Sequence, residues 1–342
     1  MIELRNIVKT FNKGTASETT AIDHLNLTLK EGDFITVIGG NGAGKSTLIN
    51  LITGSLDMDE GMILLNNNDV SKMPEYKKAQ YFGRVFQDPM VGTATDMTII
   101  ENLALAYGRG KPRSLFRWSY RKEDVEFFKN ELQILGLGLE NKLYQKVGLL
   151  SGGQRQALTL LMATIRNNPS YSKIKKDYVY FFDGDKKQAK ADIDKAFKDA
   201  KDEFKLAKEK IVKDETLSKE EKKAKINDVS LILDKKLRQF DVTKPVLLLD
   251  EHTAALDPKT AEKVLETTDR IVKSNNLTTI MITHNMKDAI KYGNRLIMMS
   301  KGKVVADISG EEKKALTIET LLDMFVVNSN NDMLADSAIF GD

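Results

Sequence analysis

The stretch Gly39-Gly-Asn-Gly-Ala-Gly-Lys45-Ser46 directly follows a continuous apolar run, Phe34-Ile-Thr-Val-Ile38. The run has the length and composition of a buried strand, and Leu48-Ile49-Asn50-Leu51-Ile52 behind the glycines has helical spacing. Strand, tight loop and helix therefore succeed one another, as in an α/β unit. In that context the pattern G-x-x-x-x-G-K-[ST] predicts a loop that binds nucleotide phosphates through backbone N–H groups, and argues against a chance glycine turn.

The residue types of this loop suit that chemistry. Glycines let backbone N–H groups face the phosphates, Lys45 can neutralise the β and γ phosphates, and the hydroxyl of Ser46 can bind Mg²⁺. The amino terminus of the following helix adds the positive end of its dipole. The candidate nucleotide-binding residues are Gly39, Asn41, Gly42, Gly44, Lys45, Ser46 and Thr47.

A second apolar run, Val246-Leu-Leu-Leu-Asp250-Glu251, ends in two carboxylates. Open α/β sheets bind ligands at the carboxyl ends of their strands. Asp250 suits the Mg²⁺ shell, and Glu251 suits the activation of an attacking water. The alternative for this stretch taken alone is an exposed acidic pair at a strand end.

A third stretch, Leu150-Ser151-Gly-Gly-Gln154-Arg-Gln156, precedes the expected helix Ala157 to Arg166. It again offers free N–H groups, glycines and a hydroxyl to an anion, so Ser151, Gly153 and Gln154 are candidates for a second phosphate-type site. A plain serine cap would explain Ser151 but not the adjoining glycines and glutamine.

The rest of the chain completes an α/β fold. Ile2 to Phe11 and Ile22 to Leu29 alternate in polarity around a Gly/Ser/Thr-rich stretch, which predicts antiparallel pairing. Further strands are expected at Val246 to Leu249, Thr278 to Ile282 and Leu296 to Met299, with helices at Ala261 to Val272 and Met286 to Tyr292. These elements predict a parallel sheet covered by helices.

The segment from Ser170 to Thr243 has a different texture, because about half of its residues are charged. Apolar residues recur in it at alternating spacings of three and four, along Ile193 to Ile211 and again along Ile226 to Phe240. Ser218 and Glu221 form a capping-box pattern between the two seams. We expect an inserted antiparallel helical hairpin with arms of about 25 residues. It is either a contact site for a partner or a solvated appendage.

Composition excludes several classes of protein. The 342 residues are 41% hydrophobic and 30% charged, which is globular composition. The net charge of +3 lacks the excess of a nucleic-acid-coating protein, and the absence of cysteine excludes disulfides and favours a reducing cytoplasm. No run reaches the length of a membrane span, so a membrane role would need a partner.

In this order, the motifs resemble those of the nucleotide-binding subunit of an ATP-binding cassette (ABC) transporter. The resemblance implies an ABC-type P-loop NTPase with an antiparallel β subdomain, an α-helical signature subdomain and the inserted charged hairpin. Gly39 to Ser46 then resembles the Walker A loop, Leu150 to Gln154 the signature, and Asp250 with Glu251 the end of the Walker B strand.

The same resemblance assigns four further residues. Gln87 in Val85-Phe86-Gln87-Asp88-Pro89 resembles the Q-loop glutamine and joins Ser46 and Asp250 as a metal candidate. Asp257 resembles the D-loop aspartate, His284 the switch histidine, and Phe11 the aromatic residue that stacks on adenine. Taken alone, Phe11 could equally be a packing residue. His284 alone could be a core histidine, and its place after Glu251 in the family order favours the functional role.

The family's mechanism implies partners. In such proteins the signature of one subunit closes on ATP held by another, so a head-to-tail pair is expected, either a homodimer or a pair with a sister chain. A cleft lined by Gln87 to about Asn102 would receive a helix of a membrane permease. The implied cofactors are ATP and Mg²⁺, and the implied place is the cytoplasmic face of the membrane.

The stretches Phe86 to Thr98, Gly148 to Thr159 and Glu251-His252-Thr253 are similar to ATPases of bacterial tryptophan/tyrosine uptake systems, which also use an extracellular substrate-binding lipoprotein. An importer for aromatic amino acids is the leading hypothesis. An exporter subunit and a soluble ABC protein of ribosomes or DNA are the alternatives.

Two features depart from the family pattern. Glu251-His252-Thr253-Ala254-Ala255-Leu256-Asp257 stands where the family usually has Glu-Pro-Thr-Ser-Ala-Leu-Asp, and His252 is expected to be a surface loop residue. The hairpin is the other departure. The expected organisation is a nucleotide-binding domain over residues 1–169 and 244–328, the insertion over 170–243 and a flexible tail over 329–342.

Overall fold

The computed structural model describes residues 1–109, 120, 122–165, 171–182, 184–238, 240 and 245–328. The chain divides into two compact units. The first comprises Met1–Leu64, Asp69–Asn167 and Pro245–Asp342, and the second comprises Leu65–Asn68 and Asn168–Lys244. The expected boundaries near residues 170 and 243, and the expected tail at 329–342, lie outside the described residues.

The first sheet has the strand order β2-β1-β4-β5. Its strands are β1 (Ile2–Phe11), β2 (Thr19–Leu29), β4 (Glu60–Leu65) and β5 (Asn68–Asp69). β1 and β2 pair antiparallel, with Ile2 opposite Leu29 and Phe11 opposite Thr19, so the predicted pairing is confirmed. Phe11 is the last residue of β1, which lies between β2 and β4 in this sheet.

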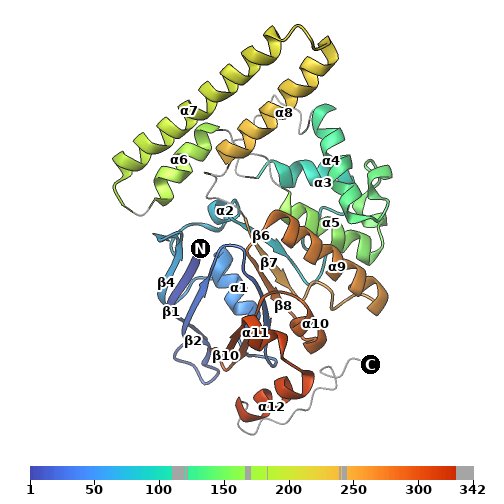
Figure 1. Cartoon of the computed structure of the whole chain (residues 1–342). Coiled ribbons are helices and arrows are strands. Elements are labelled where there is room, and N and C mark those ends of the chain that lie inside the picture. Colours follow the sequence, from blue (N-terminus) through green and yellow to red (C-terminus); the bar gives the residue numbers. More distant parts are fainter. Residues whose placement is uncertain are drawn as a thin grey trace. The chain divides into compact units, whose positions relative to one another are not determined.

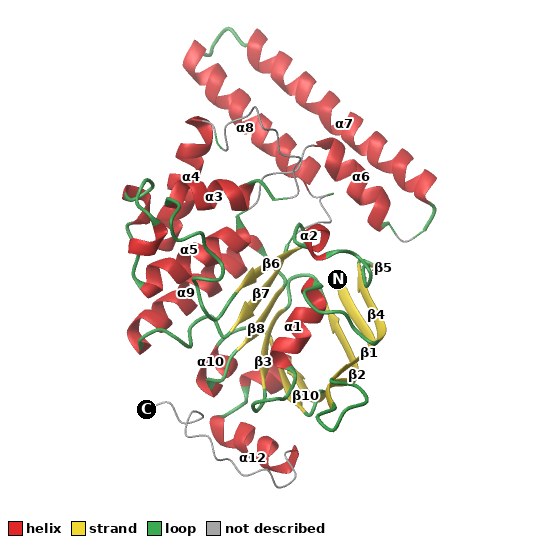
Figure 2. Ribbon diagram, turned by 180° about the vertical axis from the view of Figure 1, so that it is seen from behind, coloured by secondary structure: helices red, strands yellow, loops and turns green. Residues whose placement is uncertain are grey.

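The second sheet has the order β10-β9-β3-β8-β7-β6 (Figure 2). Its strands are β3 (Phe34–Ile38), β6 (Phe82–Val85), β7 (Val246–Asp250), β8 (Thr279–Ile282), β9 (Arg295–Ser300) and β10 (Lys303–Ser309). The pairs among β3, β6, β7, β8 and β9 are parallel, and β10 is an antiparallel edge strand. The fold class predicted from the sequence is confirmed.

Parallel pairing brings the carboxyl ends of the strands to one edge of this sheet. Asp250, at the end of β7, is in register with Ile282 at the end of β8, and Val85 at the end of β6 is in register with Leu249. Both faces of such a strand are buried, which is why β3 and β7 are continuous apolar runs. The glycine-rich loop after β3 ends at this same edge.

Helices flank this sheet. They are α1 (Lys45–Thr53), α2 (Glu75–Lys78), α9 (Pro258–Asn275), α10 (Met286–Lys291), α11 (Gly310–Lys314) and α12 (Ile318–Asn328). Helix α9 has Asp257 as its amino-terminal cap and Pro258 in its first turn, a position that suits proline because it lacks the N–H group. No helix in the described ranges has both the length and the apolar character that a membrane crossing requires.

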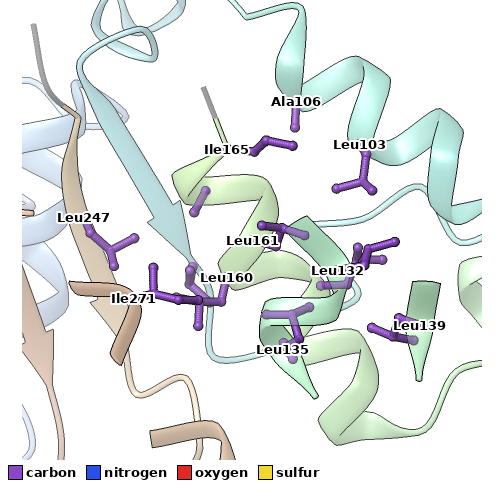
Figure 3. Close-up of a cluster of buried hydrophobic side chains, with 14 of the residues drawn as sticks. Leu103, Ala106, Leu132, Leu135, Leu139, Leu160, Leu161, Ile165, Leu247 and Ile271 are labelled. Carbon is purple, nitrogen blue, oxygen red and sulfur yellow. The ribbon is translucent and has the colours of Figure 1, made fainter. Parts of the chain in front are cut away.

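A helical subdomain of the first unit carries the serine-glycine stretch. It contains α3 (Ile99–Tyr107), α4 (Lys122–Leu135), α5 (Gly152–Thr164) and the short 3₁₀ turns Leu139–Asn141 and Val147–Leu149. Leucines of α3, α4 and α5 form one apolar cluster that continues to Leu247 on β7 and Ile271 on α9 (Figure 3). The shared core fixes the start of α5 relative to the sheet.

The second unit is helical, with α6 (Tyr171–Phe181), α7 (Lys186–Lys213) and α8 (Lys219–Arg238) (Figure 1). Helices α7 and α8 form the predicted hairpin, with arms of 28 and 20 residues and the predicted Ser218–Glu221 capping box. Its buried core is Ile174, Ile193, Phe197 and Leu237, so α6, which the sequence did not reveal, completes the base of the hairpin.

Candidate active site

The side chain of Lys45 binds to the backbone of the glycine-rich loop that precedes it. The Lys45 Nζ donates hydrogen bonds to the carbonyl oxygens of Gly39 (2.8 Å) and Gly40 (3.1 Å). Burial lowers the pKa of Lys45, while the charges of Glu251 and Asp250 act in the opposite direction. Gly44 has φ +97° and a Cβ there would lie 2.4 Å from the carbonyl oxygen of Ala21, so this position requires glycine. The predicted Thr47 follows in the first turn of α1.

Ser46 and Asp250, two of the three predicted metal ligands, lie together although they come from separate parts of the chain. The Ser46 Oγ donates to Asp250 Oδ1 at 3.2 Å. The other carboxylate oxygen, Oδ2, accepts a hydrogen bond from the Arg84 Nη2 at 3.0 Å, and the Arg84 Nη1 donates to Asn50 Oδ1 at 2.7 Å. The guanidinium also lies over the ring of Phe86. Arg84 therefore fixes the orientation of the Asp250 carboxylate.

These oxygen atoms fit magnesium. A hydroxyl and a carboxylate are the hard oxygen ligands that Mg²⁺ prefers, and Mg²⁺ is normally bound by one or two protein ligands together with substrate phosphates. In the described ranges no group of three or more His, Asp or Glu side chains is arranged to hold a metal by itself. The hydroxyl of Ser46 and the carboxylate of Asp250 would suit a metal that binds together with a phosphate ligand.

Glu251 and His284 form the closest pair of the site. Glu251 Oε1 lies 2.5 Å from His284 Nε2, and this contact is the main cause of the lowered pKa of Glu251. The backbone of Glu251 has φ +47°, an uncommon conformation for a residue with a side chain. A hydrogen bond from its N–H to the carbonyl oxygen of Ile282 (3.1 Å) ties it to β8.

A cavity of about 410 Å³ lies beside the glycine-rich loop and the Glu251–His284 pair, and Lys45, Ser46 and Asp250 are not among the residues that line it. Five predicted residues line it, namely Gly39, Asn41, Gln87, Glu251 and His284. The lining also includes Gly40, Ala254, Thr283 and the apolar side chains of Ile38, Met286 and Phe325. The loop that suits phosphate, the carboxylate that suits water activation and Gln87 thus face one space.

The predicted residues of the serine-glycine stretch are not among those lining this cavity. Ser151 caps α5, and its side chain and that of Gln154 form a reciprocal capping box with each other's backbone N–H groups, both at 3.3 Å. A Cβ on Gly153 would lie 2.1 Å from Thr260 Cγ2, so this glycine also permits α5 to approach α9. Helix capping and helix packing therefore account for Gln154 and Gly153 as well as for Ser151, whereas the sequence analysis attributed only Ser151 to capping.

Asp257 and Phe11 lie apart from the cavity lining as well. Asp257 Oδ1 accepts a hydrogen bond from the N–H of Thr260 at 3.1 Å, and bonds to Thr260 lower its pKa. Phe11 is 37% exposed, with the Lys9 Nζ 5.8 Å from the centre of its ring. An exposed ring of this kind is available for stacking with a planar ligand.

The expectation that His252 is a surface residue is wrong. Its side chain is 2% exposed, and burial lowers its pKa to about 4. Its Nε2 lies 3.3 Å from Thr268 Oγ1 on α9. A loop residue directly after an acidic strand end gave no sign of burial, because its environment comes from a helix that lies later in the chain.

Three other site residues escaped the sequence reading. Arg84 interrupts the apolar pattern of a four-residue strand, and Phe325 lies far downstream on α12. Gln156 is completely buried, and its Nε2 donates to the carbonyl oxygen of Phe86 at 3.2 Å, next to Gln87. A charged or amide residue within an apolar segment was the only signal available for Arg84 and Gln156.

Comparison with known proteins finds similarity to ATP-binding subunits of ABC transporters. The sequence profile described as ABC transporter matches residues 22–171. A tyrosine transport ATP-binding protein of Clostridioides difficile is 35% identical, over 95% of this chain and 98% of the relative. A phosphonates import ATP-binding protein of Lactococcus lactis subsp. lactis is 26% identical, over 91% of this chain and 94% of the relative.

The solved structures are similar in fold. A dimeric ATP-binding cassette in a post-hydrolysis state, bound to ADP and phosphate, has a TM-score of 0.57 and 22% identity. The match covers 90% of this chain and 98% of that one.

Proposed function

Since this chain belongs to the ABC transporter family of ATP-hydrolysing subunits, we propose that it powers a bacterial importer of aromatic amino acids or a related small solute. The observation that carries the ATP-hydrolysing part of the proposal is the cavity in which Gly39, Gly40 and Asn41 of the phosphate loop face Glu251, His284 and Gln87. The enzymatic class, an ABC ATPase, follows from the family. The direction, the cargo and the roles of single residues are parts of the proposal.

In the proposed reaction, the phosphate loop and Lys45 bind ATP. The carboxylate of Glu251 accepts a proton from the attacking water, which is typically worth about 10² to 10⁴ in rate. The short contact with His284 Nε2 orients this carboxylate and favours its ionised form. Ser46, Asp250 and Gln87 would hold Mg²⁺, which when bound neutralises charge on the phosphates.

We assign the remaining predicted residues to nucleotide contacts that need a second subunit. Ser151, Gly153 and Gln154 stand at the start of α5 and do not line the cavity of their own chain. A head-to-tail pair would allow this helix end, with its positive dipole end, to meet ATP held by the other subunit. Asp257 would lie between the two sites, and Phe11 would stack on adenine.

The proposed permease contact lies on the loop after Gln87. Met90 and Val91 are 52% and 65% exposed there, although they are large apolar residues. Exposed apolar side chains of this kind mark interaction sites. A permease helix that presses on this loop would act next to the carbonyl of Phe86, which Gln156 of α5 binds. The loop would thus connect the permease with both the cavity and the signature helix.

The most specific part of the proposal is that the transported molecule is an aromatic amino acid. It is supported by the tyrosine transport relative and by the sequence stretches shared with tryptophan/tyrosine systems. An ATPase subunit does not touch the cargo, so the inference rests on analogy. The proposed place of action is the cytoplasmic face of the membrane, with an extracellular substrate-binding lipoprotein joined through the permease.

A tagged Glu251→Gln variant, purified from native membranes with ATP present, tests the proposal. We expect a polytopic permease and a substrate-binding lipoprotein to co-purify, as identified by mass spectrometry. The matched control is the double variant Lys45→Ala/Glu251→Gln, in which ATP-dependent recovery should fall. Ribosomal proteins in place of a permease would overturn the transporter assignment.

The lipoprotein recovered in this way decides the cargo and the direction. We expect it to bind tyrosine or tryptophan in calorimetry and to show no binding of methylphosphonate, a ligand chosen to represent the phosphonate relative. The reverse preference would refute the aromatic assignment. A permease recovered without any binding protein would favour an exporter.

A further inference from the structure

The loop that follows β7 contains a buried histidine, His252. It follows Glu251 directly, on the loop between β7 and α9, and only 2% of it is exposed. The reaction as described does not use it. Its chain neighbour, however, carries the carboxylate on which the reaction depends.

The hydrogen bond of His252 has a definite direction. The Thr268 Oγ1 donates its single proton to the carbonyl oxygen of Val264 at 2.8 Å, within α9. With that proton used, the hydroxyl oxygen accepts from the Nε2 of His252, 3.3 Å away, when the imidazole is in its Nε2-protonated tautomer. This tautomer joins His252 to the middle of α9.

The backbone conformation of Glu251 has to be stabilised by its surroundings. A residue with a side chain at φ +47° is strained and keeps this conformation only where the surroundings enforce it. On one side, the N–H of Glu251 is bound to Ile282 of β8. On the other side, the chain turns at once, with the N–H of Ala254 donating to the carbonyl oxygen of Glu251 at 3.0 Å. His252 is the buried side chain within that turn.

We propose that His252 is a positioning residue for ATP hydrolysis, whose hydrogen bond to Thr268 clamps the turn after Glu251 onto α9. The clamp keeps the strained backbone of Glu251 in place, so that its carboxylate meets His284 and faces the cavity. This inference rests on the role of Glu251 in the proposed function. It also assigns a role in hydrolysis to Thr268, which lies outside the cavity lining.

The test uses Thr268, because a change there leaves His252 and the loop sequence intact. Thr268→Val has nearly the same shape and removes the hydroxyl, which accepts from His252 and donates to Val264 within α9. We expect its kcat for ATP hydrolysis to fall at least about tenfold with KM for ATP unchanged, since small displacements of a reacting group cost rate. Thr268→Ser keeps the hydroxyl and should retain at least half of the wild-type kcat.

The neighbouring Thr267 supplies a matched control. It is also buried, and its Oγ1 donates to the carbonyl oxygen of Lys263 at 2.9 Å in the same way. It has no hydrogen bond to His252 among those of the described residues. Thr267→Val should therefore match Thr268→Val in thermal stability change but retain the wild-type kcat. An equal fall of kcat in both variants would reduce His252 to a packing role.

A double-mutant cycle gives the second readout. His252→Leu fills the space without a donor, and in the clamp model His252→Leu/Thr268→Val has the same kcat as His252→Leu alone. Multiplicative losses, or wild-type kcat in Thr268→Val, would overturn the inference. If the leucine variant does not fold, the three threonine variants still decide.

Failure of the wider proposal would look different. If Glu251→Gln hydrolysed ATP normally, the role of Glu251 itself would fall. If Glu251→Gln were inactive while Thr268→Val hydrolysed ATP normally, only the clamp would fall.

Discussion

Arg84 on β6 and Asp250 on β7 form an ion pair between neighbouring parallel strands, with 3.0 Å between Nη2 and Oδ2. Both side chains are largely buried, with exposures of 16% and 12%. The same guanidinium holds Asn50 of α1. One arginine thus joins the strand before Gln87, the strand that ends in Asp250 and the helix that begins at Lys45.

The first prediction concerns this ion pair. Arg84→Met should lower the free energy of unfolding by about 3 kcal/mol or more, because it leaves a buried carboxylate without its partner. Urea denaturation measures the change. The control is Arg5→Ala, which breaks an Arg5–Glu3 pair in which the arginine is 55% exposed, so the loss of stability should be far smaller. Equal losses in the two variants would contradict the structural role of Arg84.

The second prediction concerns the proposed base. Glu251→Gln keeps the size of the side chain but cannot take a proton, so kcat should fall by roughly 10² to 10⁴ while ATP binding remains. Steady-state hydrolysis and equilibrium binding of a fluorescent ATP analogue measure the two quantities. Normal turnover in this variant would refute the assignment of the base.

The third prediction concerns Lys45. Lys45→Ala should weaken ATP binding at least about tenfold, because it removes the cation that neutralises the phosphates. Lys78→Met is the matched control, since Lys78 is a buried lysine, 1% exposed, on α2 and outside the glycine-rich loop. Its affinity for ATP should equal that of the wild type. Unchanged affinity in Lys45→Ala would mean that phosphate binds elsewhere.

The fourth prediction uses Lys313 on α11, which is 3% exposed and donates to the carbonyl oxygens of Tyr292 and Gly293. Burial lowers its pKa to about 8, from 10.5. Between these values the unfolded chain binds more protons than the folded chain, so stability contributed by this group rises with pH, by up to about 3 kcal/mol.

Lys313→Arg stays charged over the whole range and Lys313→Met carries no charge at all, so both variants should lack this rise. The measurement is the difference in unfolding free energy between wild type and each variant, from pH 7.5 to 10.5. A difference that does not change with pH would show that the folded state does not perturb Lys313.

The fifth prediction concerns the hairpin. Replacing residues 204–232 with a short glycine turn removes the outer arms but keeps the core residues Ile193, Phe197 and Leu237. We expect unchanged folding and unchanged ATP hydrolysis by the purified chain. If the hairpin contacts a partner, assembly with the permease or transport in cells should fall. Unchanged transport would leave it a solvated appendage.

The sequence was sufficient where function and fold place local demands on neighbouring residues. The phosphate loop, β3, β7 and the capping box at Ser218 are all signalled within a few residues, by glycine, by apolar runs or by side-chain spacing. The cavity then unites Gly39, Glu251 and His284, as their order along the chain implied.

What escaped prediction depends on distant partners. Strand β6 contains Gly83 and Arg84, which break its apolar pattern. Both make sense only in the fold: a Cβ on Gly83 would lie 2.2 Å from the carbonyl oxygen of Ala163 on α5, and Arg84 serves Asp250. The burial of His252 by α9 and the placement of Phe325 in the cavity arise in the same way.

Strand β6 is synthesised long before β7, the strand with which it pairs. Val85 and Leu249 are register partners, yet about 160 residues, including the whole hairpin, separate them. At a ribosomal rate of about 5 to 20 residues per second, β6 waits roughly 10 to 30 s for its partner. During that interval the unpaired N–H and C=O groups of β6 are open to other strands. Those of β3 are open for longer, since its partners β8 and β9 are made later still, so the nascent chain is exposed to misassembly at both strands.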